Sequence, residues 1–336
     1  MNKNLVLVVA AGSILLCGCH KKSENPFTQQ NAEGQFSTFA TLRQAQGPQE
    51  IQNEGPKKES TMQITNEMSP QLTLEYYKER PEVKLGTVKH ETYYSNTCRM
   101  ERGFSILLPA SYDGVKKYPV VYFQHGIFGD ENGTVQDDSN KFKQISANLA
   151  YDGKAREMIF VFGHMYATDD PNQKPGFDAV AIKPYDNFLN ELVNDLMPYI
   201  ESHYAVLTGR ENTAVCGFSM GGRESLYIGL ERPDLFAYIG AIAPAPGLVP
   251  GKDGFMTHEG TLQENEVQFP DGMPLPEFVM ICCGTVDSVV GKFPLSYHKL
   301  FEQNGIDHLW FEINGADHNN IAIRTGLYYF IQKAFQ

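Results

Sequence analysis

The pentapeptide Gly-Phe-Ser-Met-Gly at 217–221 constrains the fold more than any other part of the sequence. The apolar run Thr213–Cys216 before it predicts a buried strand, and Arg223–Glu231 after it predicts a helix that ends before Pro233. A serine between a strand and a helix needs a sharp turn, and flanking glycines let the two elements approach closely. We therefore predict a strand–turn–helix unit that projects the Ser219 hydroxyl at the carboxyl edge of a sheet.

The rest of the globular region alternates apolar, strand-like runs with helical periods. Continuous apolar runs are typical of strands that helices cover on both faces of a mainly parallel sheet. From 187 to 201 apolar residues recur every four positions, which predicts a helix with one buried stripe, capped by Asp186. Further helices are expected after Ser219, at about 294–304 and from Asn320 to the end. The expected strands are 104–108, 120–124, 158–162, 213–216, 238–243, 278–283 and 309–313.

This alternation predicts one doubly wound α/β domain at residues 81–336. The sequence shows no internal repeat. The stretch Pro244–Pro276 is rich in glycine and proline and has little periodicity, so we expect a surface excursion that is too short to form a separate cap domain.

The N-terminus has the layout of a bacterial secretory signal. Lys3 precedes an apolar run from Leu5 to Leu16, which is shorter than the roughly 20 residues that a membrane-spanning helix needs. The residues Leu-Cys-Gly-Cys that end at Cys19 resemble the lipobox of bacterial lipoproteins, in which the cysteine is lipidated. We therefore predict a signal peptide at 1–19 and an exported, membrane-anchored lipoprotein, periplasmic or on the cell surface.

A segment of different composition follows the predicted signal. From His20 to Pro70, 11 of 51 residues are apolar and 8 are glutamine. So little apolar surface cannot offset the loss of chain entropy on folding. We predict a flexible tether at residues 20–80 that holds the domain away from the membrane.

Four cysteines remain once Cys17 and Cys19 are assigned to the signal. Three of them lie inside apolar runs and are expected to be small buried hydrophobes, and Cys98 lies in a polar stretch. No Cys-x-x-Cys suggests zinc or redox chemistry, and the sequence leaves any disulfide pairing open. The three are Cys216, Cys282 and Cys283.

The serine needs a base, because a hydroxyl is a poor nucleophile until its proton is taken. In sites with this turn the acid and then the histidine follow the serine along the chain. His318 lies in a loop directly after the last expected strand, where the base belongs. His298 falls in a helical stretch and His308 begins a strand, so we expect both to be structural or surface groups.

The acid is expected in the loop after the preceding strand. Asp287 follows the apolar run 278–283 at the required place. Asp317 is the alternative, but neighbours on a loop seldom point at each other. Asp287 would accept a hydrogen bond from the imidazole of His318, fix its tautomer and stabilise the imidazolium.

Two backbone amides are expected to hold the oxyanion. One is the N–H of Met220, in the first turn of the helix after the serine. The other is the N–H of Ile127, in the loop after the strand 120–124, where Gly126 gives the turn its freedom. His125 is expected to brace this loop.

Six motifs in a fixed order complete the picture. They are Leu-Leu-Pro-Ala-Ser-Tyr-Asp (107–113), Lys-Lys-Tyr-Pro-Val-Val-Tyr (116–122), His-Gly-Ile-Phe-Gly-Asp-Glu (125–131), Gly-Phe-Ser-Met-Gly-Gly (217–222), Arg-Pro-Asp-Leu-Phe (232–236) and Cys-Gly-Thr-Val-Asp (283–287). Together they resemble the esterase D group of α/β-hydrolases, which includes feruloyl and acetyl xylan esterases of carbohydrate esterase family 1 and S-formylglutathione hydrolases.

The resemblance runs from about residue 85 to the C-terminus. It implies an α/β-hydrolase fold with no separate cap domain, and a serine esterase that needs no metal or organic cofactor. The implied triad is Ser219, Asp287 and His318, with Ile127 and Met220 as oxyanion donors. Members often carry an aromatic residue soon after the histidine, whereas Asn-Asn-Ile follows it here.

The predicted export and the net charge of the chain limit the classes of substrate that we expect. S-formylglutathione hydrolases are cytosolic, so an exported lipoprotein is better suited to removing acetyl or feruloyl groups from plant polysaccharide. The formal charge of −12 argues against a nucleic-acid partner, and it does not hinder the binding of neutral glycans. Phe128, Tyr166 and Tyr185 are candidates to line a sugar or phenolic site. Alternatives are an S-formylglutathione hydrolase-like enzyme, a siderophore-ester hydrolase or a peptidase of the same fold, and a non-catalytic glycan-binding lipoprotein. The acyl group, the glycan and the oligomeric state stay open.

Overall fold

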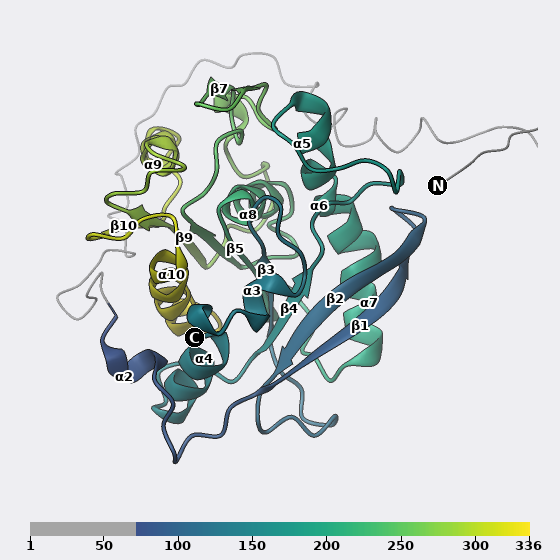
Figure 1. Ribbon diagram of the computed structural model, residues 1–336, viewed down its shortest axis with the longest axis vertical. Coiled ribbons are helices and arrows are strands. Elements are labelled where there is room, and N and C mark those ends of the chain that lie inside the picture. The colour runs from purple at the N-terminus through teal and green to yellow at the C-terminus, as the bar shows by residue number, and fades with distance from the viewer. Residues whose placement is uncertain (1–71) are drawn as a thin grey trace, which may run out of the picture. The chain divides into compact units, whose positions relative to one another are not determined.

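The computed structural model describes residues 72–336, and Figure 1 shows their central sheet with helices on both sides. The sheet has eight strands in the order β1-β2-β4-β3-β5-β6-β9-β10. β2 is antiparallel to both β1 and β4, and the other pairs are parallel. This mainly parallel α/β sheet confirms the predicted fold class. The strands are β1 (Thr87–Ser95), β2 (Met100–Leu108), β3 (Val120–Gln124), β4 (Ile159–Gly163), β5 (Thr213–Phe218), β6 (Tyr238–Ile242), β9 (Phe278–Gly284) and β10 (Leu309–Ile313).

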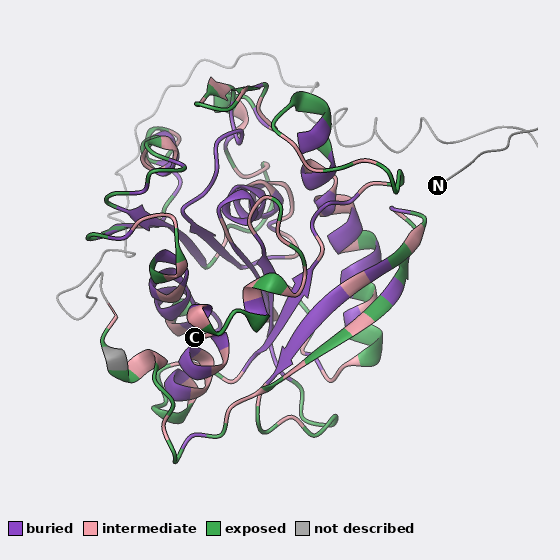
Figure 2. Cartoon of the chain, viewed as in Figure 1, coloured by how far each residue is buried: buried purple, intermediate pink, exposed green. Residues whose placement is uncertain are grey.

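The central strands are buried along their whole length, which explains their continuous apolar sequences. Every residue of β3, β4, β6 and β9 is buried. Along β3, Val120 and Tyr122 contribute to the hydrophobic core on one face, and Val121 and Phe123 to the core on the other. Figure 2 shows this buried centre, with exposed residues along the outer faces of the helices.

Strand β1 was not predicted. Only Tyr93 and Ser95 of its nine residues are buried, because it lies at the edge of the sheet and pairs with β2 alone. Its pairing also extends β2 back to Met100, four residues before the expected start at Phe104.

The helices divide between the two faces of the sheet. The first face carries α5 (Ala179–Asp186), α6 (Phe188–Glu191), α7 (Met197–His203), α8 (Met220–Glu231) and α9 (Phe293–Gln303). The second carries α2 (Leu74–Tyr77), α4 (Phe142–Tyr151) and α10 (Asn320–Lys333). The short elements are α3 (Gly133–Gln136), the 3-10 turns Asp138–Asn140, Arg210–Asn212 and Glu264–Glu266, and the hairpin strands β7 (Gly251–Lys252) and β8 (Thr257–His258).

The helix expected at 187–201 forms with a different internal geometry. A π-helical turn at Leu192–Leu196 joins α6 to α7, and Pro198 stands in the first turn of α7. The prediction of Asp186 as N-cap was wrong, because this residue ends α5 and its carboxylate pairs with Arg223. The predicted apolar stripe is fully buried; its residues are Phe188, Leu192, Leu196 and Ile200.

Residues 72–80, which were assigned to the tether, pack on the domain. The Asn148 side chain donates to the carbonyl oxygens of Tyr76 and Lys78, at 3.1 and 3.0 Å. Arg80 pairs with Asp152 at 2.9 Å. The domain therefore includes residues from 72 onward, whereas the predicted signal peptide and the tether up to residue 71 lie outside the described residues.

The excursion expected at 244–276 lies only partly on the surface. Residues 244–249 are all buried, and Leu248, Leu262 and Val267 join the core on the α8 side. Its exposed residues include the turn between β7 and β8 and the stretches 263–265 and 271–275. Within residues 72–336, no helix has the length and apolar character needed to cross a membrane.

All four cysteines of the described residues are buried and free of disulfides. This confirms burial for Cys216, Cys282 and Cys283. Cys98 is also buried, because the turn between β1 and β2 packs against the buried Glu191, whose carboxylate lies 3.3 Å from its sulfur.

Candidate active site

The turn around Ser219 has the strained geometry that its sequence predicts. Ser219 follows β5 at φ 59° and ψ −119°, and α8 begins at the next residue. A Cβ on Gly217 would lie 2.3 Å from the carbonyl oxygen of Gly221, and one on Gly221 would lie 2.2 Å from that of Gln124. Backbone contact between β3, β5 and α8 therefore excludes any side chain at either glycine.

The loop after β10 brings a histidine to a carboxylate. The Nδ1 atom of His318 lies 2.8 Å from Oδ2 of Asp287. The ring of Phe218, the neighbour of Ser219, packs on the imidazole with centroids 4.4 Å apart. Because the carboxylate can only accept, Nδ1 carries the proton and Nε2 is left as a base.

Asp287 is held in its ionised form. Burial is the largest influence and opposes ionisation, but hydrogen bonds from His318 and from the N–H groups of Val290 and Val289, each at 3.0 Å, together outweigh it. The pKa of Asp287 therefore lies below its ordinary value.

Asp317, the alternative acid, makes different hydrogen bonds from Asp287. Its carboxylate accepts from the backbone N–H groups of Ser288 and His318, both at 2.8 Å, and from the Ser288 hydroxyl at 3.0 Å. It ties the two loops together, while Asp287 contacts the imidazole.

The loop after β3 lies against the serine. A Cβ on Gly126 would be 3.5 Å from the Cβ of Ser219. Among the hydrogen bonds of the described residues, none uses the N–H of Ile127 or of Met220. Both amides that the sequence singled out are therefore available to an anion beside the serine.

His125 braces this loop, as expected. Its Nε2 accepts from the N–H of Met165 at 3.0 Å, so its Nδ1 is protonated and donates to the Gly126 carbonyl at 2.7 Å. Burial lowers the pKa of His125 to about 4, so its imidazole is neutral at pH 7.

We call the loop at residues 125–131 the oxyanion loop, because it contains the predicted donor Ile127. Three exposed phenylalanines, one of them in this loop, form what we call the aromatic ridge. Phe128 is 56% exposed and meets Phe177, whose ring centroid lies 5.2 Å away. Phe177 stacks on Phe255 at 4.7 Å, and these two are 44% and 57% exposed. The sequence candidates Tyr166 and Tyr185 are instead buried, so neither ring is offered to a ligand.

Residues 95–273 match the profile of the Esterase family, described as "Putative esterase". The chain belongs to this esterase family. A ferulic acid esterase of family CE1 from Anaeromyces mucronatus, solved in complex with ferulic acid, is 47% identical with a TM-score of 0.76. That match covers 80% of this esterase and 97% of the other chain, which places this esterase with the CE1 type.

More distant relatives have lower identity to this chain. An endo-1,4-beta-xylanase/feruloyl esterase of Xylanibacter ruminicola is 26% identical over 227 residues, 66% of this chain and 28% of that protein. The esterase thus spans less than a third of this longer relative. An S-formylglutathione hydrolase from Agrobacterium tumefaciens has 17% identity over 74% of this chain and 96% of that one, and its TM-score of 0.57 shows a shared fold.

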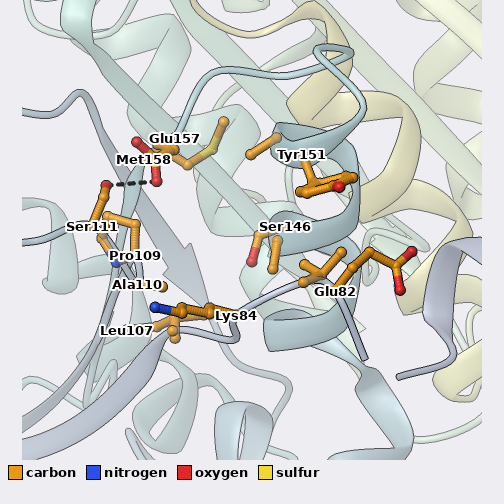
Figure 3. Close-up of a pocket in the computed structure, with 14 residues that line it drawn as sticks. Glu82, Lys84, Leu107, Pro109, Ala110, Ser111, Ser146, Tyr151, Glu157 and Met158 are labelled. Carbon is orange, nitrogen blue, oxygen red and sulfur yellow. Dashed lines mark hydrogen bonds between the residues drawn. The ribbon is translucent and has the colours of Figure 1, made fainter. Parts of the chain in front are cut away.

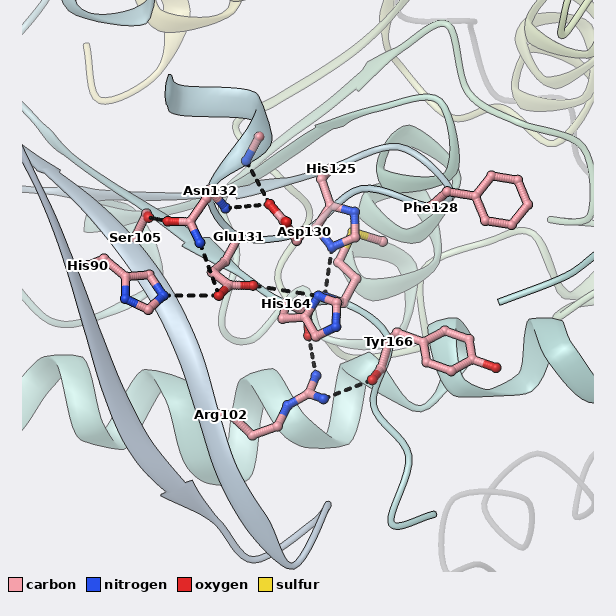
Figure 4. A network of polar contacts seen from close by, with 12 residues as sticks. His90, Arg102, Ser105, His125, Phe128, Asp130, Glu131, Asn132, His164 and Tyr166 are labelled. Carbon is pink, nitrogen blue, oxygen red and sulfur yellow. Dashed lines mark hydrogen bonds and ion pairs between the residues drawn. The ribbon is translucent and has the colours of Figure 1, made fainter. Parts of the chain in front are cut away.

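A polar network that the sequence did not reveal surrounds Glu131 and Arg102 in this esterase (Figure 4). Glu131 lies 3.0 Å from Nε2 of His90 and 3.7 Å from Nδ1 of His164. Arg102 donates to the carbonyl oxygens of Tyr166, at 2.9 Å, and of His164. The network therefore joins β1, through His90, to the loop after β3 and joins β2, through Arg102, to the loop after β4. Within the described part, no group of three His, Cys, Asp or Glu residues is arranged to hold a metal.

The structure also has a cavity of about 460 Å³. Figure 3 shows the side chains that line it. It is lined by Leu107 from the end of β2, Met158 just before β4, and Tyr151 from α4. Leu107 pairs with Phe160 near the start of β4, so the cavity sits at the amino end of the parallel strands. Ser219, Asp287 and His318 follow the carboxyl ends of β5, β9 and β10, so the cavity is separate from them.

Proposed function

We propose that this esterase hydrolyses feruloyl or acetyl esters of plant polysaccharide through a Ser-His-Asp acyl-enzyme mechanism. The observation that carries the proposal is the 2.8 Å contact between His318 and Asp287, at the carboxyl edge that also presents Ser219. The 47% identity to a ferulic acid esterase supports the ester class.

The mechanism uses the pair His318–Asp287 and the serine that lies at the same edge of the sheet. Nε2 of His318 takes the proton of Ser219 as its oxygen attacks the ester carbonyl. The N–H groups of Ile127 and Met220 stabilise the oxyanion. The imidazolium then gives its proton to the departing sugar oxygen as the acyl–oxygen bond breaks. Water, activated by the same imidazole, releases the acid and restores the serine.

The aromatic ridge favours a feruloyl over an acetyl group. A phenolic ring gains from stacking on exposed aromatic faces, whereas an acetyl group reaches no further than the serine. We expect Phe255→Ala to lower kcat/KM for methyl ferulate about tenfold, the loss of one aromatic contact. Hydrolysis of p-nitrophenyl acetate serves as the matched measurement and should stay within about twofold. Equal losses on both esters would remove the ridge from acyl recognition.

The catalytic proposal is tested by Ser219→Ala. The variant should lose hydrolysis of methyl ferulate and p-nitrophenyl acetate and also labelling by a fluorophosphonate probe, while keeping the thermal midpoint of the parent protein. Retained activity would take Ser219 out of the mechanism. A parent protein that binds xylan but resists the probe would favour the non-catalytic glycan-binding alternative.

A substrate panel separates the remaining alternatives. We expect feruloylated oligosaccharide or acetylated xylan to give the highest kcat/KM. S-formylglutathione, a siderophore ester and a peptide should be turned over far more slowly. A higher rate on one of these three would replace the polysaccharide proposal with the corresponding activity.

We further propose that the esterase is exported and held at a membrane by lipid on Cys19. The lipobox-like residues and the preceding apolar run support this proposal. Cys19→Ala should abolish incorporation of labelled palmitate and release the esterase from the membrane fraction. Palmitate labelling that persists in this variant would contradict lipidation at Cys19.

A further inference from the structure

The backbone of Phe128 is held in an unfavourable conformation. Its φ is 63°, a region that costs a residue with a side chain about 1 kcal/mol or more. Its N–H donates to the hydroxyl oxygen of Tyr185 at 3.1 Å. Phe128 directly follows Ile127, so this bond fixes the peptide group next to the proposed oxyanion donor.

Tyr185 is itself firmly placed at the end of α5. It is fully buried, and its two following neighbours are each tied to another segment around the serine. The Asp186 carboxylate pairs with Arg223, one turn into α8 from Ser219. The Asn187 side chain donates to the Ala167 carbonyl, after β4, at 2.9 Å.

We propose that Tyr185 is a positioning residue that aims the Ile127 amide at the oxyanion. The consecutive residues 185–187 thus contact three segments: the oxyanion loop, α8 and the loop after β4. Without the hydroxyl, the turn keeps only the bond from the Gly129 N–H to the Gly126 carbonyl, at 3.1 Å, so the peptide between Ile127 and Phe128 gains freedom to rotate. The inference rests on the proposed serine-esterase function and adds a residue that contacts neither substrate nor triad.

The neighbouring Tyr166 offers a matched control. Its ring lies 5.1 Å from that of Tyr185, and it is also buried. Within the described residues its hydroxyl has no hydrogen-bond partner. Figure 4 shows its ring on the same side of the network as Phe128. Tyr166→Phe therefore removes the same atom from the same surroundings without touching the oxyanion loop.

The experiment compares Tyr185→Phe and Tyr166→Phe on p-nitrophenyl acetate and on its thiono analogue. In the analogue, sulfur replaces the carbonyl oxygen and accepts hydrogen bonds poorly, so its rate depends less on the oxyanion donors. We expect Tyr185→Phe to lower kcat for the oxygen ester about tenfold, less than the loss of a whole donor, with KM within about twofold. The thiono rate should fall less than about threefold, and Tyr166→Phe should match the parent protein on both.

Three results would overturn the assignment. They are a kcat for Tyr185→Phe within about twofold of the parent protein, an equal fall on the oxygen and thiono esters, or the same fall in Tyr166→Phe. Thermal midpoints of both variants check that the domain is folded. Since this test uses a small acetyl ester, failure of the parent protein to hydrolyse methyl ferulate would count against the proposed substrate alone.

Discussion

Two segments flank Ser219, and they are held in place in different ways. The turn that carries the serine is fixed by backbone crowding, since Gly217 and Gly221 touch neighbouring main chain and leave no room for a side chain. The oxyanion loop is fixed by hydrogen bonds. Its supports are the N–H of Met165 and the hydroxyl of Tyr185.

The difference shows how each segment can fail. Steric crowding arises where Gly217 lies against Gly221 and Gly221 lies against the main chain of Gln124, so a side chain at either glycine damages the fold. The supports of the loop lie 40 and 57 positions away from the residues they hold. We expect the loss of one of these hydrogen bonds to change the orientation of the Ile127 N–H while the domain stays folded. The three predictions below test this contrast, from the largest expected effect to the smallest.

The largest effect is expected at the hydrogen bond between Asp287 and His318, the proposed base for Ser219. Asp287→Asn should lower kcat by about 10⁴-fold, because the amide no longer fixes the imidazole tautomer or stabilises the imidazolium. The pKa of Asp287 is depressed, so the parent protein has this charge at neutral pH. Steady-state kinetics on p-nitrophenyl acetate measures the loss.

Asp317→Asn is the control for that variant. Its carboxylate joins the two loops without touching the imidazole ring, so kcat should fall less than about tenfold. A larger loss in Asp317→Asn than in Asp287→Asn would reverse the assignment of the acid.

The second prediction concerns the crowded turn. Gly221→Ala would place a Cβ 2.2 Å from the Gln124 carbonyl oxygen and should lower the free energy of unfolding by about 3 kcal/mol. Gly126→Ala is the matched change on the oxyanion loop, where the nearest atom would be 3.5 Å away, and should cost less than about 1 kcal/mol. Urea unfolding measures both. Equal costs would mean that the two segments are held alike.

The third prediction concerns His125. In the unfolded chain an imidazole takes up a proton near pH 6.5, whereas burial keeps the folded His125 neutral down to about pH 4. Stability from the neutral ring is therefore complete above about pH 6.5 and is lost as the pH falls toward 4.

The parent protein should thus lose about 2 kcal/mol more stability than His125→Asn between about pH 7.5 and about pH 5. Urea unfolding at the two pH values measures this difference. An identical pH dependence in both proteins would contradict the neutral brace.

Several features were within reach of the sequence because their causes are local. The buried strands gave continuous apolar runs, and α8, α9 and α10 began within a few residues of their expected positions. Strand β1 was not predicted because an exposed edge strand needs no apolar pattern. Seven of its nine residues are not buried. The π turn at Leu192–Leu196 escaped because the apolar spacing continues through it.

By itself, the sequence determined the strand–turn–helix unit around Ser219 and the chain order that places His318, and it favoured Asp287 as the acid with Asp317 as the alternative. Glycine spacing and strand order are properties of neighbours along the chain, so they can be read without coordinates. Only the tertiary structure decided that Asp287 and not Asp317 meets the imidazole, that Phe128, Phe177 and Phe255 form one ridge, and that Tyr185 holds the oxyanion loop. These contacts join segments from different connections, and hydrogen bonds and ring stacking between such segments leave no pattern in the sequence.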